Sequence, residues 1–485
     1  MRLDRHFLQM ALPGIEIISH GLSQEYSFSI DTRTLCPGDL FIALSGKQVD
    51  GHSFLAAAVQ QGAVGLLIAA DKKEALSKLN QTTLKKLFIA TVPDTLATLL
   101  RLAHVWRSQF EIPMIGITGS MGKTSTKEIL STILSLAGIN HLSSLGNQNT
   151  KIGVALNLLR LRPENKIAII EMGISQRGEM AQLADLVRPT NAIITTIGHS
   201  HMEGLGSLAD IALEKRDIFK FFTEKSIGII NGDVSLLSQV SYIHPMVKFG
   251  SKTINQIQAR KIRISTSSTS FVLKIYKQKY QVTVPKAHEG AVYNALAATA
   301  LAYLLNIPVD TILAGIQKAI VVEGRFEERT MKEHAGLIIN DCYNANPESM
   351  KAALLAFEKY ETKAQKVAVL ADMLELGVNS PFWHRQLGRF LRKVPSLKKV
   401  ILVGEMVKWT KKTAPVSLPV ELVATWQEAL HYLKTDLATE SVVLLKGSHG
   451  MKLGNLVDAL SSVKDVTVTS EQRIPIVSAF VAPGV

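Results

Sequence analysis

The sequence predicts an α/β protein of three domains, and three observations support this fold class. The chain has 485 residues, of which 47% are hydrophobic, so it can fill several domains of ~100–200 residues each. Apolar strand-like runs alternate with helix-like stretches in its second and third parts, which favours parallel sheets covered by helices. A glycine-rich turn follows one of these runs near residue 120. We expect a small mixed α/β domain at 1–110, a central parallel-sheet domain at 111–325 and a doubly wound, Rossmann-like domain at 326–485.

The first two parts are separated by a change of pattern near residue 110. Before it, short strand-like and helix-like stretches surround the turn Pro37-Gly38-Asp39. After it, residues 114–117 form an apolar run typical of a buried strand, and a helix is predicted from about 123 to 138. Further strands and helices are expected at 166–171, 179–187 and 192–197, followed by a helical run at 208–222.

The third part begins after a break at Glu323-Gly324-Arg325. Its expected elements alternate between short apolar strands and longer helices. The strands are predicted at 337–339, 366–370, 399–403 and 441–445, and the helices at 347–360, 383–391 and 426–433. This alternation is typical of a doubly wound domain, in which helices cover both faces of a parallel sheet.

The composition argues against several classes of protein. Apolar runs fall well short of the ~20 residues that a spanning helix needs, and no signal peptide is visible, so no transmembrane segment is expected. Two cysteines, Cys36 and Cys342, are too few for a disulfide framework and fit a reducing cytoplasm. The net charge is +13, but Lys and Arg occur singly or in pairs. We therefore expect a mixed, solvated surface or a field that gathers small polyanionic substrates, and no nucleic-acid partner.

The strongest signal for function is the segment 116–124, which lies between a predicted strand and a predicted helix. Gly119 and Gly122 allow backbone N–H groups to approach a phosphate, and the helix offers its positive end. The Lys123 ammonium can reach the β and γ oxygens of a nucleotide, and the Thr124 hydroxyl can bind magnesium. The alternative is a glycine turn that only joins strand to helix.

Three further side chains could complete a metal site, although each has an ordinary alternative. Glu171 ends an apolar strand, which is the arrangement that holds Mg²⁺ opposite a phosphate loop, or else it faces solvent. His201 lies in a loop after a strand and could be a ligand, a structural residue or a surface residue. Lys215 lies in the expected helical run at 208–222 and, taken alone, is expected to be a solvated helix lysine.

Taken together, these motifs resemble the Mur ligases, and the resemblance extends from about Thr32 to Met451. It implies an ATP-dependent enzyme that joins an amine to a carboxylate on a nucleotide-linked cell-wall precursor. It also implies that the first domain binds the nucleotide sugar, that the second is an ATPase domain and that the third receives the amine. The residues that the resemblance assigns to substrate binding in the first two domains are Thr32, Arg33, Gly46, Asp50, His52, Asn147 and Asn149.

The resemblance assigns further roles by position. It implies ATP contacts from Thr118, Gly119, Ser120, Met121, Gly122, Lys123, Thr124, Ser125, Asn294 and Arg325. It implies two Mg²⁺ ions held by Thr124, Glu171, His201 and Lys215, with Lys215 carbamylated so that it offers oxygen donors. It implies catalytic roles for Lys123, Lys215, His201 and Asp341, and substrate contacts from Asn344, Asn346, Ser349 and Lys446.

One segment indicates a branch of the family. Residues 343–347, Tyr-Asn-Ala-Asn-Pro, are similar to the branch that adds D-alanyl-D-alanine to UDP-N-acetylmuramoyl-tripeptide, whereas sister ligases usually have His at the position of Asn344. An Asn side chain offers a dipeptide both a neutral donor and a neutral acceptor. Asn346 and Pro347 could instead only shape the start of a helix. The open alternatives are a sister ligase that adds a diamino acid and a non-catalytic nucleotide-binding relative.

The sequence also departs from the expected patterns. Ile117 stands where the strict phosphate-loop pattern has glycine, and the departures from the family pattern are Thr150, Thr196, Gly290, Ala291, Ala371 and His449. Gly290 and Ala291 fall near the expected adenine pocket. The phosphate and metal residues are all present, which favours an active enzyme.

The chemistry that the resemblance implies is phosphorylation of a carboxylate by ATP, followed by attack of a neutral amine on the acyl phosphate. Arg325 and Asp341 come from across a domain boundary, so we expect the third domain to close on the second. We also expect a cytoplasmic monomer.

Overall fold

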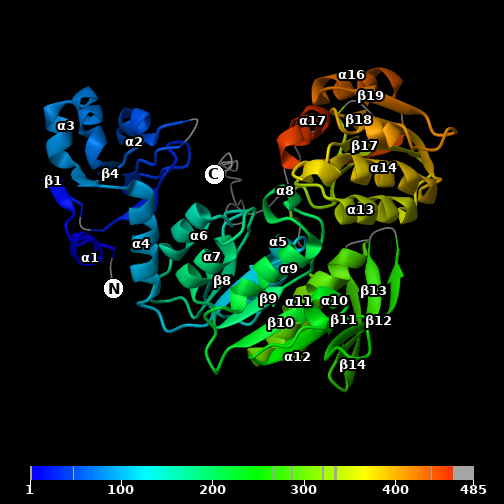
Figure 1. Ribbon diagram of the computed structural model, residues 1–485, viewed down its shortest axis with the longest axis horizontal. Coiled ribbons are helices and arrows are strands. Elements are labelled where there is room, and N and C mark those ends of the chain that lie inside the picture. The colour runs from blue at the N-terminus through cyan, green and yellow to red at the C-terminus, as the bar shows by residue number, and fades with distance from the viewer. Residues whose placement is uncertain are drawn as a thin grey trace.

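A computed structural model of the chain describes residues 3–23, 25–46, 49–265, 268–285, 288–318, 322–332, 336–438 and 440–461. These residues form three sheets with accompanying helices, arranged as a V with the central sheet at its base (Figure 1). The predicted α/β fold with three domains is confirmed. The end of the predicted third domain, residues 462–485, lies outside the described residues.

The N-terminal sheet has five strands in the order β1-β5-β4-β3-β2. The strands are β1 (Glu16–His20), β2 (Ser27–Ser29), β3 (Asp39–Ile42), β4 (Gly65–Ala69) and β5 (Phe88–Val92), and the helices are α1 (Arg5–Ala11), α2 (Leu55–Gln60), α3 (Gln81–Lys86) and α4 (Thr95–Arg107). β1 is antiparallel to β5, and the other neighbours are parallel. Trp106 of α4 donates from Nε1 to the main-chain oxygen of Leu161 at 3.1 Å, and one core runs through both domains here.

The central sheet has nine strands in the order β14-β13-β12-β11-β10-β9-β6-β8-β7. The strands are β6 (Met114–Thr118), β7 (His141–Ser143), β8 (Ile167–Glu171), β9 (Asn191–Ile194), β10 (Ile227–Asn231), β11 (Met246–Gly250), β12 (Ile257–Ile264), β13 (Thr269–Ile275) and β14 (Gln278–Val284). The helices are α5 (Lys123–Leu136), α6 (Lys151–Leu158), α7 (Glu179–Val187), α8 (Met202–Leu205), α9 (Leu208–Arg216), α10 (Ser235–Ser238), α11 (Glu289–Leu304) and α12 (Val309–Gln317). α5, α11 and α12 cover one face, whereas α6, α7 and α9 cover the other.

The expectation of a parallel central sheet is only partly right. β6 to β12 are parallel to their neighbours, but β13 and β14 add an antiparallel hairpin to the edge at β12. Along β13 the buried side chains alternate with half-buried ones, which is the period-two pattern of a strand with one covered face. An expectation based on continuous apolar runs misses such a strand.

The third sheet has six strands in the order β15-β16-β20-β17-β18-β19, all parallel except β15 against β16. The strands are β15 (Glu327–Thr330), β16 (Leu337–Asn340), β17 (Gln365–Ala371), β18 (Leu397–Val403), β19 (Val420–Val423) and β20 (Ser441–Lys446). The helices are α13 (Pro347–Lys359), α14 (Ser380–Phe390), α15 (Lys408–Lys411), α16 (Trp426–Asp436) and α17 (Leu453–Leu460). One apolar cluster lies on each face, so the doubly wound arrangement is confirmed.

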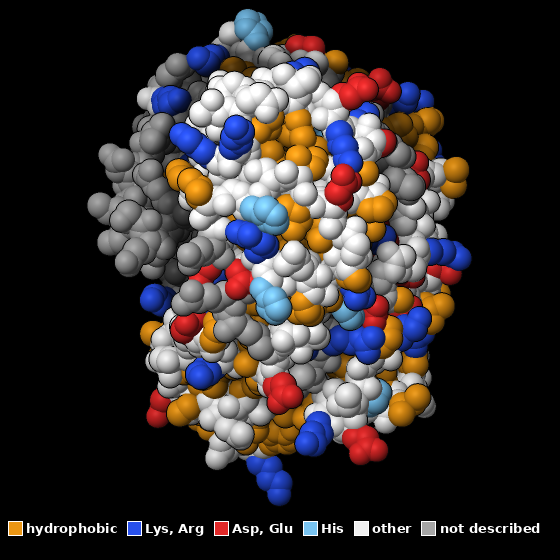
Figure 2. Space-filling model, turned by 90° about the vertical axis from the view of Figure 1, so that its left-hand side faces the viewer, with side chains coloured by type: hydrophobic (Ala, Val, Ile, Leu, Met, Phe, Trp, Pro, Cys, Tyr) orange, Lys and Arg blue, Asp and Glu red, His pale blue; other side chains and the backbone are white. Residues whose placement is uncertain are grey.

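On the face that Figure 2 presents, the positive charge is dispersed. Figure 2 shows Lys and Arg side chains spread among acidic, apolar and His side chains on the face that it presents. This distribution agrees with the expected mixed surface. In the parts of the chain that the structure describes, no helix is both long enough and apolar enough to cross a bilayer.

Candidate active site

The phosphate loop follows β6 and leads into α5, as the sequence predicts. Two glycines are needed here because of close approaches. Gly119 has φ +147°, and a Cβ on it would lie 1.9 Å from Oγ1 of Thr195. Gly122 has φ +82°, and a Cβ on it would lie 2.3 Å from Oδ1 of Asn294. The second contact places Asn294, a predicted ATP-binding residue, directly against the loop.

The loop is held in shape by the segment that follows β9. The Ser120 N–H donates to the main-chain oxygen of Thr196 at 2.9 Å, and the Ser120 hydroxyl lies 2.9 Å from the main-chain oxygen of Gly198. The Thr195 hydroxyl donates to the main-chain oxygen of Met121 at 2.5 Å. Thr196, a departure from the family pattern, contributes here through its backbone, so its side chain is not needed for this contact.

Lys123 lies at the start of α5 with its ammonium turned back over the loop. Its Nζ donates to the main-chain oxygen of Gly119 at 2.9 Å. Burial lowers the pKa of Lys123; the Glu171 carboxylate raises it, and the Arg325 guanidinium lowers it further. Glu171 and Arg325, both predicted site residues, therefore lie within electrostatic range of Lys123. The hydroxyls of Thr118 and Thr124 are buried here without a hydrogen-bond partner.

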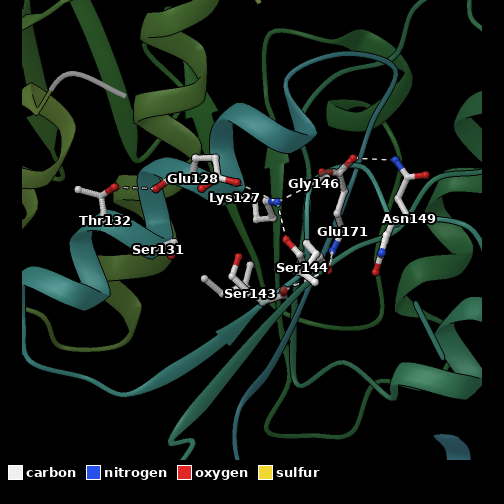
Figure 3. A network of polar contacts seen from close by, with 12 residues as sticks. Lys127, Glu128, Ser131, Thr132, Ser143, Ser144, Gly146, Asn149 and Glu171 are labelled. Atoms are coloured by element: carbon white, nitrogen blue, oxygen red, sulfur yellow. Dashed lines mark hydrogen bonds and ion pairs between the residues drawn. The ribbon is translucent and has the colours of Figure 1, made fainter. Parts of the chain in front are cut away.

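Glu171 ends β8 and is only 1% exposed, which excludes the solvent-facing alternative. Its Oε1 accepts a hydrogen bond from Nδ2 of Asn149 at 2.8 Å, and its main-chain N–H donates to the Ser144 hydroxyl at 3.0 Å (Figure 3). Its Oε2 is buried and has no partner. A buried carboxylate oxygen without a partner is costly unless a cation or a donor occupies the space beside it.

Lys215 is buried within α9 and is only 1% exposed, so the expectation of a solvated helix lysine is wrong. Burial holds its pKa well below the usual range, and the charge of Lys123 adds to this effect. The neighbouring Glu214 carboxylate raises the pKa, but by less than these two effects lower it. Glu214 also accepts the backbone N–H groups of Gly178 and Met180, each at 3.0 Å. The buried residues of α9 are Ile211, Ala212, Glu214 and Lys215, so Lys215 lies one turn after Ile211 on the buried side of the helix.

His201 is directed toward the third domain. Its Nδ1 forms an ion-pair contact with Oε2 of Glu375, and the hydrogen bond from His201 lowers the pKa of Glu375. Across the residues that the structure describes, no three His, Cys, Asp or Glu side chains come together as a metal cluster. Two oxygens of the predicted metal residues, Thr124 Oγ1 and Glu171 Oε2, are buried without partners, and both are of the kind that a hard cation binds.

At the boundary between the central and third domains, an arginine stacks on a tyrosine. The Arg325 guanidinium lies 3.8 Å from the centre of the Tyr343 ring. Burial raises the pKa of Tyr343, whose hydroxyl also interacts with Asn147 and Arg325, and whose surroundings include the Glu171 carboxylate. Tyr343 therefore touches both an arginine expected to bind ATP and a loop expected to bind the precursor.

Asp341 and Lys446 form a buried ion pair at 2.7 Å. Asp341 Oδ1 also accepts the N–H of Phe326 at 3.2 Å, and Lys446 Nζ donates to the main-chain oxygen of Asn344 at 3.1 Å. This arrangement fixes the 341–344 turn. The predicted catalytic and substrate residues here are thus already paired with each other.

The three other predicted residues of this segment make local bonds. Asn346 Oδ1 accepts the N–H of Ser349 at 2.8 Å, and the Ser349 hydroxyl accepts the N–H of Asn346 at 2.9 Å, which forms the N-terminal cap of α13 with Pro347 as its first residue. Asn344 Oδ1 accepts the N–H of Ala345 at 2.8 Å. The turn-shaping role is confirmed for Asn346; substrate contacts by these residues stay a prediction.

A cavity of about 410 Å³ lies between the central and third domains. Predicted site residues line it from both sides: Met121, Gly122, Ser125, Asn294, Arg325, Asp341, Ser349 and Lys446. Gly290 and Ala291, the departures expected near the adenine, also line it.

The walls of this cavity include an acidic residue that the sequence analysis missed, Asp233. Its carboxylate accepts hydrogen bonds from the Tyr293 hydroxyl at 2.9 Å and from the N–H of Ser251 at 2.6 Å. The Asn231-Gly232-Asp233 turn after β10 was the available signal.

The first-domain candidates lie outside this cavity. His52 is buried, with Nδ1 2.6 Å from Asp50 and Nε2 accepting the N–H of Ala69 at 2.9 Å, so both ring nitrogens are engaged within the domain. Arg33 forms an ion pair with Asp31 and is exposed, beside Thr32. Gly46 donates its N–H to the main-chain oxygen of Val49 at 3.0 Å. Of these residues, His52 is the least able to touch a substrate.

Together the fold and the site define a three-domain enzyme whose central domain carries a phosphate loop and whose third domain adds side chains across a cavity. Family models match residues 26–104 as "Mur ligase family, catalytic domain", 117–302 as "Mur ligase middle domain" and 324–449 as "Mur ligase, glutamate ligase domain". The chain belongs to the Mur ligase family, as the motifs predict.

Relatives with curated names cover nearly the whole chain. It is 33% identical to UDP-N-acetylmuramoyl-tripeptide–D-alanyl-D-alanine ligase of Bacillus subtilis (strain 168), over 90% of this chain and 93% of that protein. It is 34% identical to the ligase of the same name from Escherichia coli (strain K12), over 89% of this chain and 92% of that protein. Among solved structures, MurF from Acinetobacter baumannii has a TM-score of 0.78 at 28% identity, covering 95% of this chain and 98% of that one. MurF ligase from Thermotoga maritima in complex with ADP has a TM-score of 0.74 at 26% identity, covering 89% and 96%.

Proposed function

We propose that this chain uses ATP to join D-alanyl-D-alanine to UDP-N-acetylmuramoyl-tripeptide, a step of cell-wall precursor synthesis. The reaction is the one in the names of the Bacillus subtilis and Escherichia coli relatives. The observation that carries the proposal is the cavity between the central and third domains, which joins the phosphate loop to Arg325, Asp341 and Lys446. Such a cavity can hold a nucleotide and a second reactant side by side.

The reaction proceeds in two transfers. The precursor carboxylate attacks the γ-phosphorus of ATP, and ADP leaves, which gives an acyl phosphate. The neutral amine of the dipeptide then attacks the acyl carbon, and the tetrahedral intermediate loses phosphate, which carries away one amine proton, to form the amide. The first transfer needs mainly positioning and charge neutralisation, which Lys123 at the loop and Arg325 from across the cavity are placed to supply.

Mg²⁺ would neutralise the phosphate oxygens when bound, and Thr124 and Glu171 offer it buried oxygens without partners. A carbamate on Lys215 would give the cation a further oxygen donor. Its depressed pKa favours the neutral amine, which is the form that reacts with carbon dioxide to give a carbamate. Carbamylation would turn this neutral amine into an anion within electrostatic range of the Lys123 ammonium. His201 could also bind the cation if its side chain turned away from Glu375.

The remaining assignments belong to the same proposal. The division at 1–110, 111–325 and 326–485 gives the first domain the nucleotide sugar, bound by Thr32, Arg33, Gly46 and Asp50. Asn147 and Asn149 approach the precursor from the loop beside Glu171. Asp341 orients the amine or an ATP group, and Asn344 takes part in choosing the dipeptide. We propose that the enzyme acts as a monomer in the cytoplasm.

The test is to mix the protein with ATP, Mg²⁺ and UDP-N-acetylmuramoyl-tripeptide, and to offer D-alanyl-D-alanine, L-alanine, D-glutamate, L-lysine or diaminopimelate in turn. We expect phosphate release and a product heavier by one D-alanyl-D-alanine, measured by mass spectrometry. A parallel assay replaces the tripeptide precursor with UDP-N-acetylmuramoyl-dipeptide. A product with a diamino acid in that assay, and none with D-alanyl-D-alanine in the first, would indicate the sister ligase. No phosphate release with any amine would indicate a nucleotide-binding protein without ligase activity.

A further inference from the structure

Lys127 lies one turn after Lys123 on α5, and its side chain is completely buried. The motifs of the phosphate loop end before it, and it does not line the cavity. A lysine ammonium in such a place is costly unless every N–H finds an acceptor. Helix formation alone therefore does not explain why a lysine is buried at this position.

Each of the three ammonium hydrogens of Lys127 has an acceptor. Nζ donates to the main-chain oxygen of Ser144 at 2.6 Å and to that of Gly146 at 3.1 Å, and it pairs with Oε1 of Glu128 at 2.9 Å (Figure 3). Two of the three acceptors belong to the loop after β7. Lys127 thus ties that loop to the helix that starts at the phosphate loop.

The loop that Lys127 ties down holds Glu171 at two points. The Ser144 hydroxyl accepts the main-chain N–H of Glu171 at 3.0 Å. Further along the loop, Asn149 donates from Nδ2 to Oε1 of Glu171 at 2.8 Å. Both the backbone and the carboxylate of Glu171 are therefore placed by the loop, and the loop is placed by Lys127.

Lys127 and Thr124 lie three residues apart on α5 and so share one side of the helix. Thr124 Oγ1 and Glu171 Oε2, both buried without partners, come from this helix and from the strand that the loop contacts. We infer that Lys127 is a positioning residue, which sets the Glu171 carboxylate relative to Thr124 and so prepares a divalent-cation site before any ligand binds. This inference rests on the proposed function for its assignment of these oxygens to Mg²⁺.

The inference is tested with Lys127→Met, which keeps the length and apolar stem of the side chain and removes the ammonium. We expect the Mg²⁺ concentration needed for half-maximal ADP binding, measured by calorimetry, to rise ~10-fold or more, in line with the loss on removing a residue that orients a metal ligand. ADP binding without Mg²⁺ should change little. Hydrogen exchange of peptides spanning 144–149 should quicken roughly tenfold in the ligand-free protein, while the end of α5 stays protected.

Lys366→Met is the matched control. Lys366 is likewise buried, on β17 of the third domain, and its Nζ donates to the main-chain oxygen of Glu358 at 2.8 Å. Like Lys127, Lys366 does not line the cavity. We expect Lys366→Met to lower thermal stability without moving the Mg²⁺ dependence. Equal Mg²⁺ dependence in Lys127→Met and the wild type, whatever the loss of stability, would overturn the inference.

Ser144→Ala provides a second route if Lys127→Met does not fold. This variant removes only the hydroxyl that holds the Glu171 N–H, and we expect the same change in Mg²⁺ dependence, smaller in size. An unchanged Mg²⁺ dependence in a folded Ser144→Ala protein would also count against the inference. Failure of the proposed function has a separate signature, because the wild type would then form no product with D-alanyl-D-alanine, whatever its Mg²⁺-dependent binding of ADP.

Discussion

The two sides of the cavity are built differently. On the central side, the phosphate loop and Glu171 are fixed by bonds within one domain, from Ser120, Ser144 and Asn149. On the other side, the third domain meets the loop after β9 through side-chain contacts of His199 and His201 and a main-chain bond from Glu203. The phosphate half of the site is therefore preorganised, whereas the amine half depends on how the third domain is held.

The cross-domain contacts gather around the loop after β9. His199 donates its N–H to Oε2 of Glu348 at 3.0 Å, forms an ion-pair contact with the same carboxylate, and stacks 4.1 Å from the Trp383 ring. His201 contacts Glu375, whose main-chain oxygen accepts the N–H of Glu203 at 3.1 Å. The same loop also shapes the phosphate loop through Gly198. Domain placement and nucleotide binding therefore share one segment.

The largest effect is expected on the preorganised side. Lys123→Ala removes the ammonium that the loop presents to the phosphates, and a loss of at least ~10²-fold in kcat is expected, as for other single charge stabilisers. The fold should survive, because in the described part of the chain the Lys123 ammonium makes a single hydrogen bond, to the main-chain oxygen of Gly119. Circular dichroism and turnover on the same sample check both points. Near-normal turnover in a folded variant would remove Lys123 from the mechanism.

A smaller loss is expected from Lys215→Ala, about 10- to 100-fold on the scale of metal-site partners. If Lys215 is carbamylated, short carboxylic acids should restore part of the activity by occupying the space of the lost carboxylate. Acetate and formate added to the assay check this, with Lys123→Ala as the control that they should not rescue. Activity unaffected by any acid, together with an intact-mass spectrum lacking the carbamate, would argue for a plain lysine.

Substitutions on the third-domain side of the cavity should change activity less. Glu348→Gln removes the charge that meets His199 across the domain boundary, and a partly exposed pair of this kind contributes ~0.5–1 kcal/mol. We expect the apparent KM for the dipeptide to rise about two- to fivefold with little change in kcat. Glu358→Gln is the control, since Glu358 bonds Ser396 within the third domain. A 10²-fold fall in kcat would show that the third domain is as finely placed as the phosphate loop.

The smallest effect concerns stability. The folded-state pKa of Lys215 lies below its ordinary value of 10.5, so the unfolded chain binds a proton that the native chain releases between the two values. Native stability from this source rises with pH through that window. Lys215→Met should therefore raise the melting temperature in carbonate-free buffer, most on the acid side, with the gain shrinking toward pH 10.5. A gain that grows with pH would contradict the burial argument.

Sequence reasoning reached the fold and the phosphate half of the site because both depend on local patterns. Alternating strands and helices, and the Gly-Lys-Thr turn between a strand and a helix, can each be predicted from a short stretch of sequence. It failed for β13 and β14, where alternation replaces apolar runs, and for Lys215, whose burial comes from packing between distant elements. Lys127 and the pairing of Asp341 with Lys446 were invisible for the same reason, since their partners lie far along the chain.

The two cysteines differ in a way that bears on how the molecule can be observed. Cys342 is buried beside the Asp341–Lys446 pair, and burial raises the pKa of its thiol far above the usual range, so it stays protonated and unreactive. Cys36 is exposed, in the first domain. The native chain thus carries a single accessible handle for a maleimide dye. Fluorescence from that position could follow the first domain in solution without any engineered substitution.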